Sequence, residues 1–309
     1  MIKDIHEEGK VELPCLITKC DKGKTTKGTP YLSLTLEDST GVLDAKFWNL
    51  TDAQVEMYAS GMVVEATGDI IIHKNAIQLR VRTLKELKDQ DITQFVRQAP
   101  MTKQEMMEEV ERYLSMVQDE SLFLITQTIL DEKEKEYYSY SAATKNHHNF
   151  VGGLAYHSLS MLKMALSVCE LYPWLDQDLI ICGTLLHDVG KIKELSSPVL
   201  PEYTTEGNLI GHISLMGNYI DRVSYQLHLE NEESILLLKH MILSHHGKTD
   251  FGSPVVPMIP EAEVLATIDN LDARMYMMKQ SIDATQPGEF GPRVFALENR
   301  MIYRRKEKK

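Results

Sequence analysis

The chain has 309 residues, 43% of them hydrophobic and 25% charged, which is enough to bury a large core and is typical of two domains. The net charge of −12 excludes a chain that is basic throughout, but residues 1–85 are almost neutral, with 11 Lys and Arg against 12 Asp and Glu. The four cysteines lack Cys-x-x-Cys spacing, and we find no signal peptide and no uncharged apolar run of about 18 residues, so we expect a cytoplasmic protein without membrane attachment.

The first part of the chain alternates apolar and polar residues over short segments that are separated by turn residues. This pattern predicts β-strands. The predicted strands cover residues 11–19, 31–37, 42–48, 62–72 and 76–82, with a helix over 51–59 between the third and the fourth. Five strands with a helix in that position are typical of an OB-fold. The sequence therefore predicts an N-terminal five-stranded OB-fold β-barrel over residues 1–85 that binds nucleic acid.

The alternation also assigns the two faces of the predicted strands. Leu32, Leu34 and Leu36 share one phase and should fill the barrel, whereas side chains of the other phase face outward. Outward aromatic rings beside lysines suit the stacking of bases and the contact with a phosphate backbone. The candidate substrate contacts of the barrel are Tyr31, Lys46, Trp48, Lys22, Lys24 and Lys27. The alternative is that the two aromatic rings pack against the second domain.

Residues 86–101 are charged and polar and predict a linker. A helix should begin after it, because Thr102 and Glu105 have the spacing of a capping box. We expect the remaining residues, 102–309, to form an all-α domain. Its first helices carry an apolar stripe that either joins the core of this domain or forms the interface of a homo-oligomer.

Histidines and aspartates recur in the second half of the chain, each beside apolar residues at helical spacing. They are His157, His187, Asp188, His212, His245, His246 and Asp269. Imidazole and carboxylate groups bind Zn, Mn or Fe, and one aspartate can bridge two ions. A charged aspartate among leucines is costly unless it is paired or bound to a metal. The sequence therefore predicts a metal site within residues 157–269.

The order of these residues resembles the HD superfamily of metal-dependent phosphohydrolases, and the run from His187 through Asp188 to Lys191 matches it as well. The resemblance implies two divalent ions. One would be held by His157, His187, Asp188 and Asp269, and the other by Asp188, His212 and His245 or His246. Manganese is the metal we expect first, although such ligands also accept Fe, Co, Ni or Zn.

Such an ion pair hydrolyses phosphate esters, because it binds the attacking and leaving oxygens and lowers the pKa of water. Asp188 and Lys191 are the catalytic candidates, and the Lys191 ammonium would contact a phosphate oxygen. The alternative is that Lys191 satisfies a helix end. Three weaker candidates for substrate contacts are His147, His148 and Arg274. A polar loop before a helix and a surface arginine explain these three nearly as well.

A barrel for nucleic acid followed by an HD domain resembles the YhaM family of 3′-to-5′ exoribonucleases. The resemblance implies removal of nucleotides from the 3′ end of single-stranded RNA, with single-stranded DNA as a further substrate. The run after His246 lacks the Gly-Tyr-Pro element of cyclic di-GMP phosphodiesterases of the HD-GYP type. Two alternatives remain open, namely a phosphodiesterase for small or cyclic nucleotides and a nucleic-acid-binding scaffold with a vestigial HD site.

Overall fold

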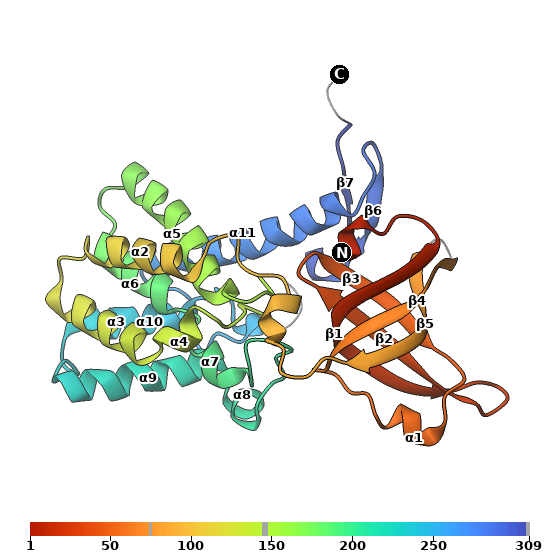
Figure 1. Ribbon diagram of the computed structural model, residues 1–309. Helices are drawn as coiled ribbons and strands as arrows, with labels where there is room; N and C mark the ends of the chain where they lie inside the picture. Colours follow the sequence, from red (N-terminus) through yellow and green to blue (C-terminus); the bar gives the residue numbers. More distant parts are fainter. Residues whose placement is uncertain (74–75, 144–147, 307–309) are drawn as a thin grey trace. The chain divides into compact units, whose positions relative to one another are not determined.

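The computed structural model describes residues 1–73, 76–143 and 148–306. The chain divides into two compact units, residues 1–98 and residues 99–309, which are drawn in Figure 1.

The first unit is a closed five-stranded barrel with the strand order β1-β2-β3-β5-β4. Its elements are β1 (Gly9–Lys24), β2 (Pro30–Asp38), β3 (Gly41–Phe47), α1 (Asp52–Val55), β4 (Val63–His73) and β5 (Ala76–Glu86). Neighbouring strands are antiparallel except β3 and β5, whose parallel pairing completes the barrel. The predicted OB-fold is confirmed, but β1 and β5 are longer than predicted and the helix is shorter.

The apolar phase of β2 fills the barrel as predicted, and Leu32, Leu34 and Leu36 are all buried. Their partners on β3, in the same order, are Phe47, Ala45 and Leu43. The pairing places apolar side chains of both strands on one face, and this fixes the register because a slip of one residue would turn every leucine outward.

The barrel unit extends beyond its last strand. A short 3-10 helix, η2 (Ile92–Phe95), packs against β1 and β2. Asp91 caps η2 by accepting a hydrogen bond from the backbone N–H of Thr93. The division between the units falls after Gln98, within the segment 86–101 that the sequence suggests as a linker.

The second unit is mainly helical (Figure 1). Its helices are α2 (Lys103–Leu114), α3 (Glu120–Glu132), α4 (Glu134–Tyr137), α5 (Gly153–Leu171), α6 (Gln177–Leu186), α7 (Lys191–Glu194), α8 (Thr205–Ile210), α9 (His212–Leu227), α10 (Glu233–Ser244) and α11 (Pro260–Asp283). Helix α6 packs against α5, α10 and α11, and α9 packs against α3 and α10. These contacts bring together the helices on or beside which the predicted metal ligands lie.

The apolar stripe of α2 belongs to the core of the second unit. Met106, Val110 and Tyr113 are buried in one cluster with residues of α5 and α6. The predicted capping box is present, because Thr102 and Glu105 each accept a hydrogen bond from the other's backbone N–H. The stripe therefore packs inside its own domain, as the first of the two interpretations expected.

The second unit also contains a two-stranded antiparallel sheet of β6 (Phe290–Val294) and β7 (Arg300–Tyr303). This hairpin packs against α11 and is an addition to the all-α domain expected for residues 102–309. Among the residues with described positions, no helix is both long and apolar enough to cross a membrane.

Candidate metal centre

The predicted ligands lie on or beside five helices that meet in the second unit. His157 lies within α5, and Asp269 lies within α11. His187 is the C-cap of α6, with Asp188 directly after it. The remaining candidates are His212, the first residue of α9, and His245 and His246 at the end of α10.

Asp188 lies at the middle of this group, and its two carboxylate oxygens face different histidines. Oδ2 lies 3.3 Å from His187 Nε2 and 3.9 Å from His157 Nε2. Oδ1 lies 3.6 Å from His212 Nε2 and 3.8 Å from His245 Nε2. One carboxylate therefore faces two sets of imidazole nitrogens, which is the arrangement a bridging ligand needs.

Asp269 completes the first set, and His246 lies beside the second. Asp269 Oδ1 is 3.2 Å from His157 Nε2. Potential ligand atoms of His157, His187 and Asp269 lie within 4.8 Å of one another, as do those of His212, His245 and His246. Both members of the double histidine are thus close enough to ligate, and His245 is the one that reaches Asp188.

In the double histidine and in His187, the other ring nitrogen is held by a backbone carbonyl. Nδ1 of His187 donates to the carbonyl of Thr184 at 2.8 Å, and Nδ1 of His245 donates to that of Ile242 at 2.7 Å. His246 donates in the same way to Phe251 at 2.8 Å. A proton on Nδ1 leaves the Nε2 lone pair free for a metal, so these bonds orient the rings and select the tautomer that binds.

Two carboxylates hold the other two histidines, and neither is among the site residues predicted from the sequence. Asp272 Oδ2 lies 2.7 Å from Nδ1 of His157, and Glu194 Oε1 lies 3.0 Å from Nδ1 of His212. The spacing of Asp272 to Asp269, one turn along α11, was the available signal for the first. Glu194 gave none, because its contact depends on how α7 and α9 pack.

A glycine in the predicted motif is required by that packing. A Cβ atom on Gly190 would collide with the carbonyl oxygen of His212. Glycine therefore lets the start of α9 approach the turn that carries Asp188, and it contributes a close approach rather than chemistry.

Lys191 compensates the buried charge of Asp188. Its ammonium donates to Asp188 Oδ2 at 2.6 Å, and both side chains are buried. Burial alone would raise the pKa of Asp188, but Lys191 and His187 hold that pKa well below its usual range. The carboxylate is consequently ionised at neutral pH and available to a cation.

The electrostatics around His157 are dominated by carboxylates. Burial would lower the pKa of its imidazole, but hydrogen bonds with Asp269 and Asp272 raise it to about 9. The pKa of Asp272 is in turn lowered against the effect of burial by its bonds to His148 and His157. Without a cation, a proton on His157 balances part of this negative charge.

The donor set fits divalent metal ions. Among the residues that the structure describes, four buried atoms that point into the group have no hydrogen-bond partner. They are Nε2 of His187, His212 and His245, and Oδ1 of Asp188. Buried polar atoms are rarely left unpaired in native proteins, and a metal ion satisfies lone pairs in this way.

The three predicted substrate contacts of the helical unit differ in their surroundings. His148 is buried, and its Nε2 is 2.7 Å from Asp272 Oδ2, which connects it to the metal centre through that carboxylate. Arg274 donates to both carboxylate oxygens of Glu298, at 2.7 and 3.0 Å. His147 lies outside the described residues.

On the barrel, the two predicted aromatic residues are in contact, with their rings tilted by 32°. The ring centroids of Tyr31 and Trp48 are 4.5 Å apart, and Trp48 is 38% exposed. Lys46 lies 5.7 Å from the centroid of Tyr31 and donates to Ser33. A side chain on Gly23 would overlap the Tyr31 ring, so the strand opposite leaves room for it.

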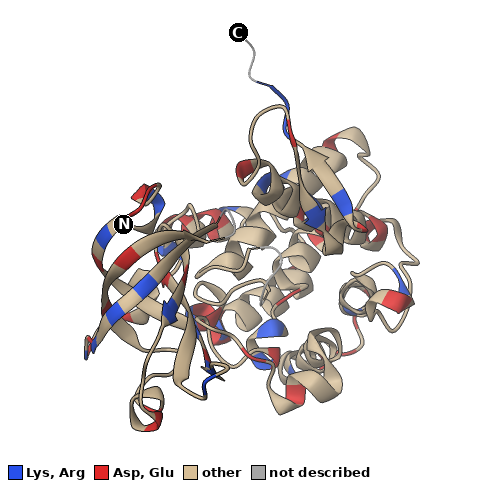
Figure 2. Cartoon of the chain, turned by 90° about the vertical axis from the view of Figure 1, so that its right-hand side faces the viewer, with Lys and Arg blue, Asp and Glu red and all other residues tan. Residues whose placement is uncertain are grey.

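The loop lysines are partly neutralised. Lys22 pairs with Glu56, and Lys24 lies 3.8 Å from Asp52, so acidic groups around α1 face both of them. Lys27 is exposed, and no ion pair is found for it within the described part of the chain. Figure 2 shows basic and acidic residues interspersed on the barrel strands, which agrees with the near-neutral charge of this unit.

Comparison with known proteins matches both units. Residues 17–87 match an OB-fold nucleic acid binding domain, and residues 154–274 match an HD domain. The chain is 43% identical over 304 residues to the 3′-5′ exoribonuclease YhaM of Bacillus subtilis (strain 168), a match that covers 97% of this chain and 96% of that protein. This chain belongs to the YhaM family. The family resemblance in the sequence is therefore confirmed.

Two solved structures resemble smaller parts of the chain. The protein priB from Ralstonia solanacearum is 17% identical, with a TM-score of 0.23, over 25% of this chain and 97% of that chain. A replication protein A heterotrimer bound to ssDNA is 15% identical, with a TM-score of 0.22, over 26% of this chain and 59% of that chain.

Proposed function

We propose that this chain is a metal-dependent 3′-to-5′ exoribonuclease that holds single-stranded RNA on its barrel and hydrolyses the terminal phosphodiester beside Asp188. The observation that carries the proposal is the position of Asp188, whose two oxygens face two groups of imidazole nitrogens in a chain related over 97% of its length to an exoribonuclease. Manganese is the metal we propose, and single-stranded DNA is a further substrate.

The distances support the two ligand sets of this proposal. His157, His187, Asp188 and Asp269 would hold one ion, and Asp188, His212, His245 and His246 would hold the other. Bound ions of this kind neutralise phosphate charge and lower the pKa of water, so that a nucleophile is available near neutral pH.

The chain's own residues orient the centre and provide positive charge beside it. Asp272 and Glu194 hold His157 and His212, so Nε2 of each ring faces the centre. Lys191 lies at the edge of the adjoining pocket, where its ammonium can contact a nonbridging phosphate oxygen as well as Asp188. Charge stabilisation of this kind matters most where water is excluded, and Lys191 is buried.

The barrel supports RNA rather than a small nucleotide as substrate. The contacting rings of Tyr31 and Trp48, with Lys46 beside them, offer an aromatic surface and a cation on β2 and at the end of β3. Stacking on aromatic rings binds single strands with little dependence on sequence. A small-nucleotide phosphodiesterase has no use for such a surface, and a vestigial site would not retain every ligand of the set.

The test is incubation of single-stranded RNA labelled at its 5′ end with the protein, in Mn²⁺ or in chelator, alongside Asp188→Asn. We expect a ladder of shortening labelled products that requires both metal and Asp188. Asp283→Asn is the matched control, because Asp283 lies on the surface of α11 and pairs only with Lys279 among the described residues. Circular dichroism should show that both variants are folded. Intact RNA under every metal would contradict the proposal, and cleavage of a circular RNA, which has no 3′ end, would indicate an endonuclease instead.

A further inference from the structure

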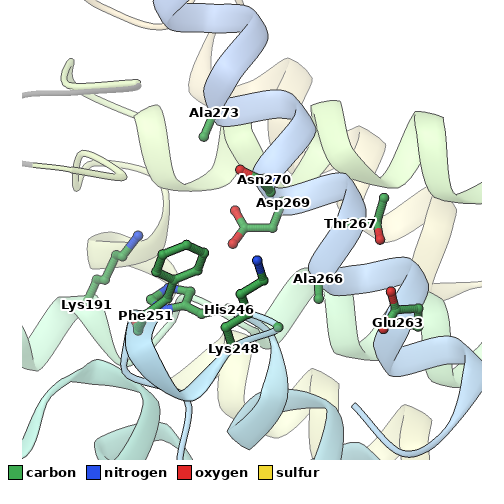
Figure 3. Close-up of a pocket in the computed structure, with 11 residues that line it drawn as sticks. Lys191, His246, Lys248, Phe251, Glu263, Ala266, Thr267, Asp269, Asn270 and Ala273 are labelled. Atoms are coloured by element: carbon green, nitrogen blue, oxygen red, sulfur yellow. Dashed lines mark hydrogen bonds between the residues drawn. The ribbon is translucent and has the colours of Figure 1, made fainter. Parts of the chain in front are cut away.

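A pocket of about 520 Å³ adjoins the metal centre, and Figure 3 shows its lining. One wall is a face of α11, formed by Glu263, Ala266, Thr267, Asn270 and Ala273. The other wall is the segment after α10, from His246 to Phe251, and Lys191 and Asp269 border the side toward the metal centre. Pockets for small ligands have volumes of about 300–1,000 Å³, so this one suits a ligand the size of a nucleotide.

The segment opposite α11 is fixed to the metal centre. His246 donates from Nδ1 to the carbonyl of Phe251 at 2.8 Å, and its backbone N–H donates to Ser253 Oγ at 3.1 Å. The position of Phe251 is therefore set by a candidate metal ligand. Its ring is 62% exposed and lines the pocket.

The groups around the pocket match the parts of a nucleotide. The Phe251 ring offers an apolar face to a base, and Lys248, whose Nζ lies 5.6 Å from the ring centroid, offers a positive charge to a phosphate. Within the described residues, the side chains of Thr267 and Asn270 have no hydrogen-bond partner, so they remain available to sugar hydroxyls.

We propose that this pocket holds the 3′-terminal nucleotide of the RNA, with its base against Phe251 and its phosphate between Lys248 and the metal centre. The inference rests on the proposed exoribonuclease function. An enzyme that removes one nucleotide at a time has a single nucleotide beyond the bond it cleaves. A pocket of this volume directly beside Asp269 provides that space.

The test is a double-mutant cycle in which the Phe251 ring and the 3′-terminal base are removed separately and together. Phe251→Ala is compared with the unaltered chain on an RNA with a normal 3′ end and on the same RNA with an abasic 3′-terminal residue. Loss of one base–aromatic stack should lower kcat/KM about 10-fold, whether the ring or the base is removed. On the abasic RNA the two proteins should be equally fast. Phe251→Trp should retain the rate on normal RNA.

Phe290→Ala is the matched control, because Phe290 is 61% exposed and does not line this pocket. It should be slowed by the abasic end as much as the unaltered chain. The inference would be overturned if Phe251→Ala were slower than the unaltered chain by the same factor on the abasic RNA as on the normal RNA. Failure of the proposed function looks different, since the unaltered chain would then leave every RNA intact.

Discussion

Asp272 is the residue whose replacement best separates orientation of the metal centre from direct ligation. Its carboxylate accepts three hydrogen bonds of 2.7 Å each, from His148 Nε2, His157 Nδ1 and Ser160 Oγ. Asp272→Asn keeps the shape and removes the charge. The amide oxygen of asparagine can still accept a hydrogen bond from His157 Nδ1, but without the negative charge that bond is weaker, so His157 is held less firmly and its Nε2 is a weaker metal ligand.

The size of the effect follows from this contact. Loss of an outer carboxylate partner of a ligating histidine lowers metal affinity or rate about 10–100-fold, which corresponds to about 1.4–2.7 kcal/mol. We therefore expect the Mn²⁺ concentration for half-maximal RNA hydrolysis to rise by that factor in Asp272→Asn, with most of the rate recovered at high metal.

The measurement is the rate of RNA shortening against Mn²⁺ concentration, with Asp283→Asn as control. Asp283 lies on the same helix, its side chain is 59% exposed, and it pairs with Lys279, so its replacement should leave the metal dependence unchanged. If folded Asp272→Asn has the same half-maximal concentration and the same rate as the unaltered chain, then Asp272 does not orient His157 and the reasoning is wrong.

Three further predictions concern pH, thiols and the barrel. In chelator, the free energy of unfolding should fall as pH rises, because folding raises the pKa of His157 from 6.5 to about 9. The stabilisation by the protonated imidazole is complete below pH 6.5 and is lost as the pH rises from 6.5 to above 9. Urea unfolding should show a fall of about 3 kcal/mol, and a flat profile would contradict it. Cys15 and Cys182, whose pKa values burial raises to about 12, should resist a thiol reagent until urea unfolds the chain; rapid reaction of either in the native state refutes this. Trp48→Ala should weaken single-stranded RNA binding about 5–150-fold by fluorescence anisotropy in chelator, and unchanged affinity would remove Trp48 from the binding surface.

The sequence predicts the barrel well because two constraints act together there. Alternation in β2 identifies the buried leucines, and turn residues at its ends limit the possible registers. The helix before β4 is less well predicted. Thr51 and Gln54 form its capping box, but only Val55 of this helix is buried, so packing supports a single turn.

The candidate site is predicted only in part. The candidate metal ligands occur in a recognisable order in the sequence, whereas the groups that form hydrogen bonds with these ligands do not. Glu194 contacts His212 across 18 residues through the packing of two helices, and backbone carbonyls such as that of Ile242 carry no sequence signal. Phe251 ends a short 3-10 helix, η3 (Thr249–Phe251), and its place beside the pocket depends on hydrogen bonds that only the fold creates.

The pairing of Asp188 with Lys191 has a consequence for how the protein matures. Their side chains are only three positions apart, so the most deeply buried carboxylate receives its counter-charge from the same turn of chain. Because Lys191 neutralises this carboxylate, the domain can fold around it without a bound ion. We therefore expect that removal of the metal abolishes activity, that the protein stays folded, and that added ions restore the activity.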